Sequence, residues 1–154
     1  MKNENLYQSL FESLRDAVWI ASVDGIILDA NPSTAEMLGC NLGKIIGSNV
    51  ITYYQNPKDR SKFIEQVMKY GFVKDYQINM KKNNGEIITC LFTATLLKGK
   101  DGNIIGFQGI VRDITNRKKM EDKLKESEEK YKELVENVNS IIAKFDNSGK
   151  IIWM

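Results

Sequence analysis

The stretch Asn103-Ile-Ile-Gly-Phe-Gln-Gly-Ile-Val-Arg112, followed at once by Asp113-Ile114-Thr115, decides how this chain folds. It is rich in β-branched and aromatic residues after a turn at Gly102, which predicts a strand. No glycine or proline occurs from Asn116 to Ser148, where lysine and glutamate are dense, and this composition predicts a helix. Asp113 and Thr115 are helix-capping residue types, so the sequence predicts that a strand leads directly into a helix here.

The predicted helix carries apolar residues at heptad spacing. Counted with Leu124 at position a, the apolar seam consists of Met120, Leu124, Tyr131, Leu134 and Val138. Arg117 and Ser127 interrupt this seam, whereas Lys123 and Glu128 occupy g and e positions, where charges pair across a parallel two-stranded coil. About three heptads are short for a coiled coil, so we expect a modest helix that dimerises in parallel.

Length and composition limit the domain count and the function classes. With 154 residues and a net charge of +2, the chain has room for one domain of about 100 residues and a linker. The segment 117–136 holds seven basic and seven acidic residues, so no patch for nucleic acid is expected. No apolar run approaches the roughly 18 residues of a membrane span, and no signal-peptide pattern opens the chain. Cys40 and Cys90 lack metal-ligand spacing, which indicates reduced thiols in a cytoplasmic protein.

The remaining segments predict an α+β fold. Residues 1–15 place apolar side chains at helical spacing, which predicts an amphipathic helix. A hairpin over 17–30 turns at Asp24-Gly25, and short helices follow up to Gly71. Turns at Asn84-Gly85 and Asp101-Gly102 separate three long strands over 72–81, 86–97 and 103–112. The sequence therefore predicts one antiparallel sheet with helices gathered on one side.

The end of the chain repeats its beginning. A shift of 124 residues places the segment 131–138 over the segment 7–14 without a gap, and the same register places Gly149 over Gly25. Internal repeats change the domain count. We therefore divide the chain into an N-terminal helix over 1–15, a domain over 16–115, a helical linker over 116–138 and the start of a second copy over 139–154. In that second copy, residues 141–145 and 151–153 are expected to form two strands.

Several short motifs occur along the chain in a fixed order. They are Asp24-Gly25-Ile-Ile, Ala30-Asn31-Pro32, Met37-Leu38-Gly39, Ile46-Gly47, Asn84-Gly85, Gly102-Asn-Ile-Ile-Gly106 and Gly109-Ile-Val-Arg-Asp-Ile-Thr115. With this order and spacing, residues 16–115 resemble the PAS (Per-Arnt-Sim) sensor family with its C-terminal PAC segment, and residues 131–154 resemble the opening of a second PAS domain. The resemblance implies a five-stranded antiparallel sheet cupped by short helices, which senses a signal and passes it along the exit helix. It also implies a downstream output domain, because such tandems usually occur in sensor kinases, cyclic-nucleotide enzymes or transcription regulators. Of these, we expect the histidine kinase of a two-component system.

The cofactors known in this family do not suit the sequence. A haem-binding member normally uses an axial histidine, and the chain contains none, although cysteine, methionine and tyrosine also ligate haem iron. The flavin-binding photosensor (LOV) branch carries Gly-x-Asn-Cys-Arg-Phe-Leu-Gln, and the matching stretch here has Val50 in place of the photoreactive cysteine. The resemblance also puts Met80, Cys90 and Val111 where that branch has amides that hydrogen-bond the flavin. Flavin and haem are therefore disfavoured, and no cofactor is predicted.

Strand alternation predicts one shared inner face for the three long strands. We expect this face to consist of Ile78, Met80, Ile88, Cys90, Phe92, Phe107, Gly109 and Val111. From the helices, Met37, Val50, Phe63 and Val67 would close it, and the nearest polar groups are Asn49, Thr52 and Tyr76. A packed core without a ligand is the simplest interpretation, and a pocket for a small, mostly apolar ligand is the alternative.

The sequence lacks the usual signatures of catalysis. No histidine is available as a general base, no glycine-rich loop cradles phosphate, and no cluster of metal ligands occurs. We therefore expect a non-catalytic sensory and dimerisation module of a multi-domain signalling protein, in which Asp113, Ile114 and Thr115 transfer the signal to the helix of a parallel homodimer. A ligand-free PAS scaffold for protein–protein interaction is the second interpretation, and a flavin- or haem-based redox or light sensor is the third.

Overall fold

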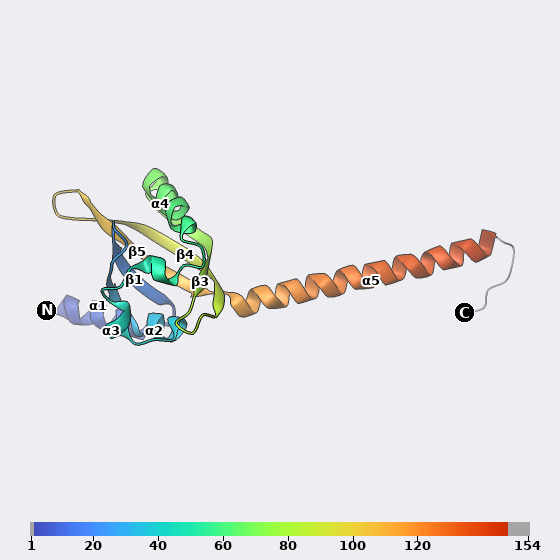
Figure 1. Cartoon of the computed structure of the whole chain (residues 1–154), viewed down its shortest axis with the longest axis horizontal. Helices are drawn as coiled ribbons and strands as arrows, with labels where there is room; N and C mark the ends of the chain where they lie inside the picture. The colour runs from blue at the N-terminus through green and yellow to red at the C-terminus, as the bar shows by residue number, and fades with distance from the viewer. Residues whose placement is uncertain (1, 148–154) are drawn as a thin grey trace. The chain divides into compact units, whose positions relative to one another are not determined.

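The computed structural model describes residues 2–147 and divides into two units, Met1–Thr115 and Asn116–Met154 (Figure 1). The elements of the first unit are α1 (Lys2–Ser13), β1 (Ala17–Ser22), β2 (Ile27–Ala30), α2 (Pro32–Leu38), α3 (Leu42–Ile45), the 3-10 turn η1 (Val50–Tyr53), α4 (Lys58–Tyr70), β3 (Phe72–Lys81), β4 (Ile87–Lys98) and β5 (Ile104–Asp113). A single helix, α5 (Thr115–Asn147), follows them.

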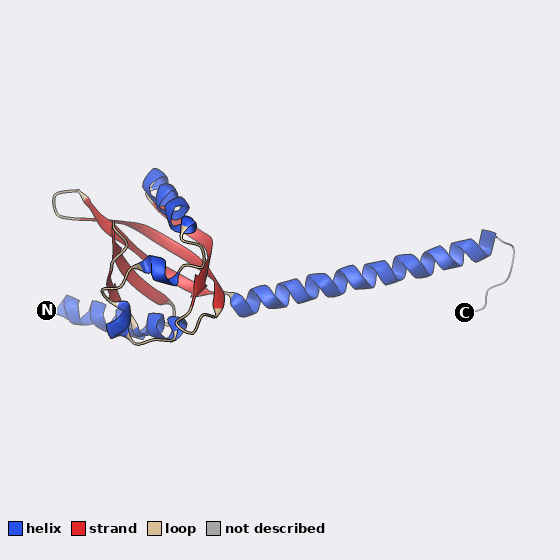
Figure 2. Cartoon of the chain, in the orientation of Figure 1, coloured by secondary structure: helices blue, strands red, loops and turns tan. Residues whose placement is uncertain are grey.

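The five strands form one antiparallel sheet in the order β2-β1-β5-β4-β3 (Figure 2). β1 pairs with both β2 and β5, so the last strand of the domain lies in the middle of the sheet. The predicted turns contain glycines with positive φ, namely Gly25 (91°), Gly85 (89°) and Gly102 (82°), a conformation that glycine adopts without strain. The predicted α+β fold, with its five-stranded sheet, N-terminal helix and C-terminal helix, is confirmed.

The two faces of the sheet carry different helices. Along β1, Trp19 is buried in the core between the sheet and the later helices, whereas its neighbour Ile20 borders α1. Successive strand residues point to opposite faces, so α1 covers the face opposite to the core. The prediction that the helices gather on one side therefore does not extend to α1.

Asn31 ties the first hairpin to α2. Its Oδ1 accepts hydrogen bonds from the Val18 N–H (2.9 Å), the Thr34 N–H (3.2 Å) and the Thr34 hydroxyl (2.9 Å). Its Nδ2 donates to the Asp16 carbonyl (3.0 Å). Pro32 occupies the start of the helix after this cap, as predicted. A fully buried amide with all these partners fixes how β1 meets the helical side of the domain.

Helix α5 continues past the linker boundary predicted at Val138, as the composition of 116–148 allows. Residues 141–145, which were expected to form a strand of a second domain, are helical, and the helix ends at Asn147. A helix satisfies its backbone hydrogen bonds within one segment, whereas a strand needs a neighbour, and residues 2–147 contain no other strand of a second sheet. The second expected strand, over 151–153, lies outside the described residues. Within 2–147, no helix combines the length and the hydropathy of a bilayer-spanning segment.

Candidate functional site

The predicted inner face forms the domain core, and a small cavity remains within it. Five of the predicted pocket residues line this cavity, namely Phe63, Phe92, Phe107, Gly109 and Val111. Others are buried in the same core without lining it, namely Val50, Val67, Ile78, Met80, Ile88 and Cys90. The cavity measures about 10 Å³, which is close to the smallest space that holds one water molecule. In this conformation the inner face is therefore packed.

Aromatic rings fill the middle of the core. Phe92 meets Trp19, Phe63 and Tyr54 edge to face, with ring centroids 5.7, 5.6 and 6.3 Å apart. Phe63 also meets Phe107 at 6.4 Å. Pairs with this geometry contribute about 0.5–1.5 kcal/mol each beyond the area they bury. The rings thus hold α4 and the residue after η1 against the sheet.

The polar residues that the sequence suggested as ligand anchors have other roles or lie elsewhere. Asn49 caps η1, because its Oδ1 accepts from the Ile51 N–H (3.0 Å), while its Nδ2 donates to the Asp24 carbonyl (3.3 Å). Thr52 is exposed, and Tyr76 is half-buried with its ring against Phe63. None of these three candidates lines the core cavity.

The structure places a different polar residue, Arg60, beside the cavity. Arg60 is 5% exposed, and its guanidinium carbon lies 5.6 Å from the ring centroid of Phe63 and 5.3 Å from that of Phe107. Cation–π contacts of this kind stabilise by about 0.5–2 kcal/mol. However, Nη2 of Arg60 is buried and has no hydrogen-bond partner in the described part of the chain. A buried donor without a partner costs about 1–3 kcal/mol, and more when it is charged.

Tyr54 is the second buried residue with an unused polar group. It is 2% exposed, and its hydroxyl has no hydrogen-bond partner among the described residues. Burial raises the pKa of this hydroxyl above its ordinary value of 10.0, and the positive charge and hydrogen-bonding approach of the Arg60 side chain oppose the rise. The two side chains are thus neighbours, although their approach falls short of a hydrogen bond of normal geometry. The hydroxyl is therefore protonated at physiological pH and can donate a hydrogen bond. It lies close enough to the Arg60 guanidinium to interact with its charge.

A sequence signal for Arg60 was present. In α4 the buried residues are Arg60, Phe63 and Val67, which follow the i, i+3, i+7 spacing of one helix face. Arginine is almost never fully buried, so the periodicity predicts the apolar members of this face more readily than its charged member. Tyr54, which follows the short turn η1, has no comparable periodic signal.

The core residues do not suit a flavin or a reactive thiol. Val50, Met80 and Cys90 are fully buried apolar groups, and Val111 is 2% exposed, so a flavin ring among them would lose hydrogen bonds at its polar edge. Burial raises the pKa of the Cys90 thiol to about 12, which keeps it protonated and unreactive. Within residues 2–147, no three or more histidine, cysteine, aspartate or glutamate side chains are arranged to hold a metal ion.

The junction between β5 and α5 is fastened to strand β4. The Ile114 N–H donates to the Thr89 carbonyl (2.8 Å), and the Thr89 N–H donates to Oγ1 of Thr115 (2.9 Å). The N–H and the hydroxyl of Thr115 both donate to Oδ1 of Asp113. Ile114 is 8% exposed. Asp113, Ile114 and Thr115, which were predicted to transfer a signal, therefore form a hydrogen-bonded link to β4. The hydroxyl of Thr115 takes part twice, because it accepts from Thr89 and donates to Asp113.

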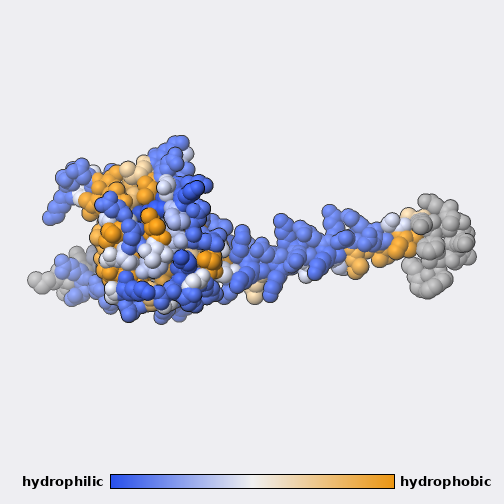
Figure 3. Space-filling model, viewed as in Figure 1, coloured by the Kyte–Doolittle hydropathy of each residue, from blue (hydrophilic) through white to orange (hydrophobic). Residues whose placement is uncertain are grey.

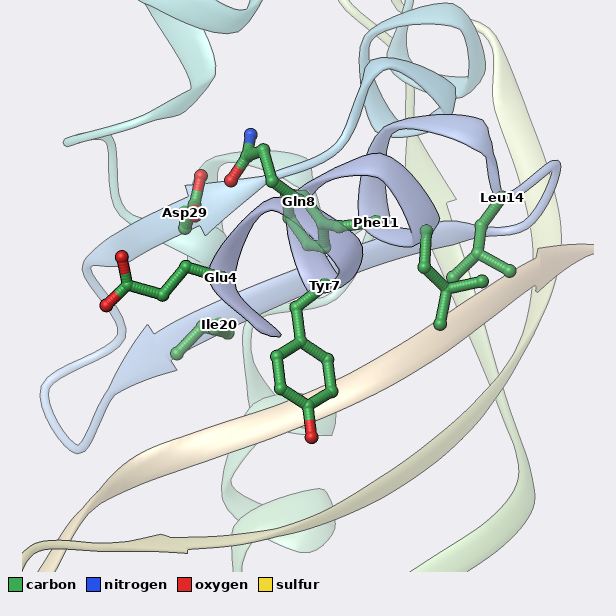
Figure 4. Close-up of a pocket in the computed structure, with 8 residues that line it drawn as sticks. Glu4, Tyr7, Gln8, Phe11, Leu14, Ile20 and Asp29 are labelled. Carbon is green, nitrogen blue, oxygen red and sulfur yellow. The ribbon is translucent and has the colours of Figure 1, made fainter. Parts of the chain in front are cut away.

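A larger hollow lies on the other face of the sheet, between α1 and the first hairpin (Figure 4). Its volume is about 610 Å³, and its lining includes Tyr7 and Phe11 from α1, Ile20 from β1 and Asp29 from β2. Leu10, which also lines the hollow, is 57% exposed, and Leu6 of the same helix is 68% exposed. None of the predicted pocket residues belongs to it.

Comparison with known proteins identifies the family. The family model described as PAS fold matches residues 5–114, so the chain belongs to the PAS family. A crystal structure of the PAS domain of a protein from Colwellia psychrerythraea superimposes with a TM-score of 0.68 at 24% identity, over 74% of this chain and 98% of that one. An RNA-binding Light-Oxygen-Voltage receptor gives a TM-score of 0.69 at 19% identity, over 82% of this chain and 37% of that one.

Two curated relatives are kinases. The chain is 24% identical to Sporulation kinase E of Bacillus subtilis over 97% of its own length, and 25% identical to the sensor histidine kinase TmoS of Ectopseudomonas mendocina over 98%. It spans only 20% and 16% of the length of these relatives, respectively. The similarity therefore concerns one segment of each kinase.

Proposed function

We propose that this chain is the sensory and dimerisation module of a multi-domain signalling protein of the sensor kinase type. Membership of the PAS family and the similarity to segments of two kinases support this proposal. In it, a change at the domain core passes through Asp113, Ile114 and Thr115 into α5, and two copies of α5 associate in parallel. The output domain belongs to the same polypeptide.

The observation that carries the proposal is the exposed apolar seam of α5. Its members keep large exposed fractions, namely Met120 (73%), Leu124 (62%), Tyr131 (70%), Leu134 (63%) and Val138 (49%). The helix surface around them is mostly hydrophilic (Figure 3). Apolar side chains at a and d positions are stabilised when a partner helix covers them, so a second copy of α5 suits this seam.

Cysteine cross-linking tests the seam. In a background with Cys40→Ser and Cys90→Ala, Leu124→Cys and Tyr131→Cys should each form a disulfide-linked dimer, whereas Lys125→Cys, on the next face of the helix, should not. Alanine suits position 90 because the site is fully buried, and a serine hydroxyl there would lack a partner. Analytical ultracentrifugation should show a dimer, whose mass is twice the chain mass of 17.6 kDa.

Cross-linking at two positions distinguishes a parallel pair of α5 helices from an antiparallel pair. In a parallel pair, every a position faces its own copy, so both Leu124→Cys and Tyr131→Cys cross-link. An antiparallel pair has its symmetry axis at one point along the helix, and at most one of the two positions lies there. Equal cross-linking at Leu124 and Lys125, or a monomer at all concentrations, contradicts the proposed seam.

A ligand-free scaffold for protein–protein interaction is the second candidate, and the packed core favours it. A cavity of about 10 Å³ holds no ligand larger than water without rearrangement. The two candidates differ in one measurable respect, because a sensor of small molecules binds a ligand inside the domain and a scaffold does not.

A further inference from the structure

Among the described residues, two buried polar groups in the core form no hydrogen bond of normal geometry, and both can donate one. They are Nη2 of Arg60, a residue of the cavity lining, and the hydroxyl of Tyr54, whose ring packs on Phe92 of the same lining. We infer that the core binds a small apolar carboxylate, whose charged group pairs with Arg60 and accepts from Tyr54 while its apolar body replaces part of the aromatic packing. The inference rests on the proposed sensory function and names the chemical class of its ligand.

The charge of Arg60 determines the ligand class. A guanidinium stays protonated in proteins, so its burial favours a negative partner. The ion pairs among the described residues are Lys82–Glu86, Arg112–Asp16 and Arg117–Glu121, and none of them includes Arg60. A carboxylate matches the planar fork of guanidinium donors with two parallel hydrogen bonds. A neutral ligand or one water molecule satisfies the donors but leaves the charge unpaired.

The surroundings of Arg60 determine the rest of the ligand. Its guanidinium lies over the rings of Phe63 and Phe107, and such contacts use the face of the guanidinium and leave the N–H groups in its plane available. Apart from Arg60 and the exposed Gln108, the cavity lining is apolar and aromatic, with residues such as Trp19, Phe92 and Val111. A compact hydrocarbon body, aromatic or short and aliphatic, fits this lining better than a polyol or a dicarboxylate.

Binding requires the cavity to enlarge, and α4 is the element suited to move. Only Arg60, Phe63 and Val67 of α4 are buried, and the residue before the helix, Pro57, makes no side-chain capping hydrogen bond. A ligand carboxylate at Arg60 would therefore shift α4 on the sheet. It would also change the contact between Arg60 and Phe107 of β5. Phe107 lies on β5, and the same strand ends at Asp113, where the link to α5 begins.

Calorimetric titration with benzoate, with benzamide as its neutral counterpart of the same shape, tests the inference. Benzoate should bind the wild-type protein at least tenfold more tightly than benzamide. Arg60→Met should weaken benzoate at least tenfold and bring it level with benzamide, and Tyr54→Phe should weaken it about threefold or more. Lys62→Met, an exposed position on the same helix, is the matched control and should leave the affinity within twofold. Thermal unfolding of each variant checks that the domain is folded.

The result that overturns the inference is equally specific. Equal binding of benzoate and benzamide, or full retention of benzoate by a folded Arg60→Met variant, removes the anion site. Failure of acetate, butyrate and benzoate to bind the wild type at millimolar concentration means that Arg60 is a packing residue with at most a water partner. If Leu124→Cys still cross-links in that case, the dimeric module stands and only its carboxylate ligand is wrong.

Discussion

Replacing Thr115 by valine tests how firmly the sheet holds the start of α5. The hydroxyl oxygen of Thr115 accepts from the Thr89 N–H at 2.9 Å, and the hydroxyl donates to Asp113. Valine has the same shape without the hydroxyl, so it leaves the half-buried Thr89 amide unpaired. A buried group left without its partner costs about 1–3 kcal/mol. Because this site is only partly buried, we expect unfolding to become easier by about 1–2 kcal/mol, which lowers the Tm by about 4–8 °C per kcal/mol for a domain of this size.

Urea unfolding at 25 °C measures this change. Trp19 is 5% exposed in the core and serves as the fluorescence reporter in a Trp153→Phe background, in which it is the remaining tryptophan. Thr115→Ser is the matched control, because it keeps the hydroxyl, and it should lie within about 0.5 kcal/mol of the wild type. Valine and serine variants of equal stability would refute the argument that the Thr89–Thr115 hydrogen bond fastens the junction.

Two further predictions concern the sheet and the core. Gly106→Ala should destabilise the domain by about 3 kcal/mol, because an added Cβ would lie 2.0 Å from the carbonyl oxygen of Ala21. Gly85→Ala, where only the positive φ of 89° opposes a side chain, should cost about 1–2 kcal/mol. Urea midpoints compare the two, and equal losses would contradict the steric argument. The raised pKa of Cys90 makes stability fall as pH rises from the ordinary value of 9.0 towards about 12, because the folded state then holds a proton that the unfolded state has released. Across this pH range the free energy of unfolding should fall less steeply with pH for Cys90→Ala than for the wild type. An unchanged slope would show that the thiol does not contribute.

The sheet was predictable because its signals are local. Turns at Gly85 and Gly102 and the alternation along the strands mark each element without reference to the rest of the chain. The cap at Asn31 was equally local, because a capping residue followed by proline has one common structural meaning. What the sequence did not reveal is that the Asn31 side chain also binds the Val18 and Asp16 backbone. Those partners depend on how the hairpin packs against the helix.

The candidate site was predictable only in its apolar part. Alternation identifies which strand residues face inward, and the buried set from Ile78 to Val111 follows that rule. Arg60 was missed because the helical spacing only places it on the face of Phe63, whereas the burial of its charge depends on tertiary contacts, among them the ring of Phe107. Gly109 shows the same limit, because an added Cβ there would lie 2.7 Å from the Thr93 carbonyl oxygen. A large side chain at Gly109 would disrupt strand pairing rather than fill the pocket, so Arg60 is the better position for testing ligand binding.

The position of β5 explains why a weak event in the core could reach α5. β5 is hydrogen-bonded to β1 on one side and β4 on the other, so it cannot relax by leaving the sheet at an edge. Phe107 and Val111 line the cavity, and Asp113 is the last residue of the same strand. We propose that a ligand favours one of two arrangements of the Asp113–Thr115 link. A tenfold difference in ligand affinity between them corresponds to about 1.4 kcal/mol, which shifts an even population to about ten to one. The Thr89–Thr115 hydrogen bond contributes a similar free energy, so losing it should alter the response to ligand without unfolding the domain.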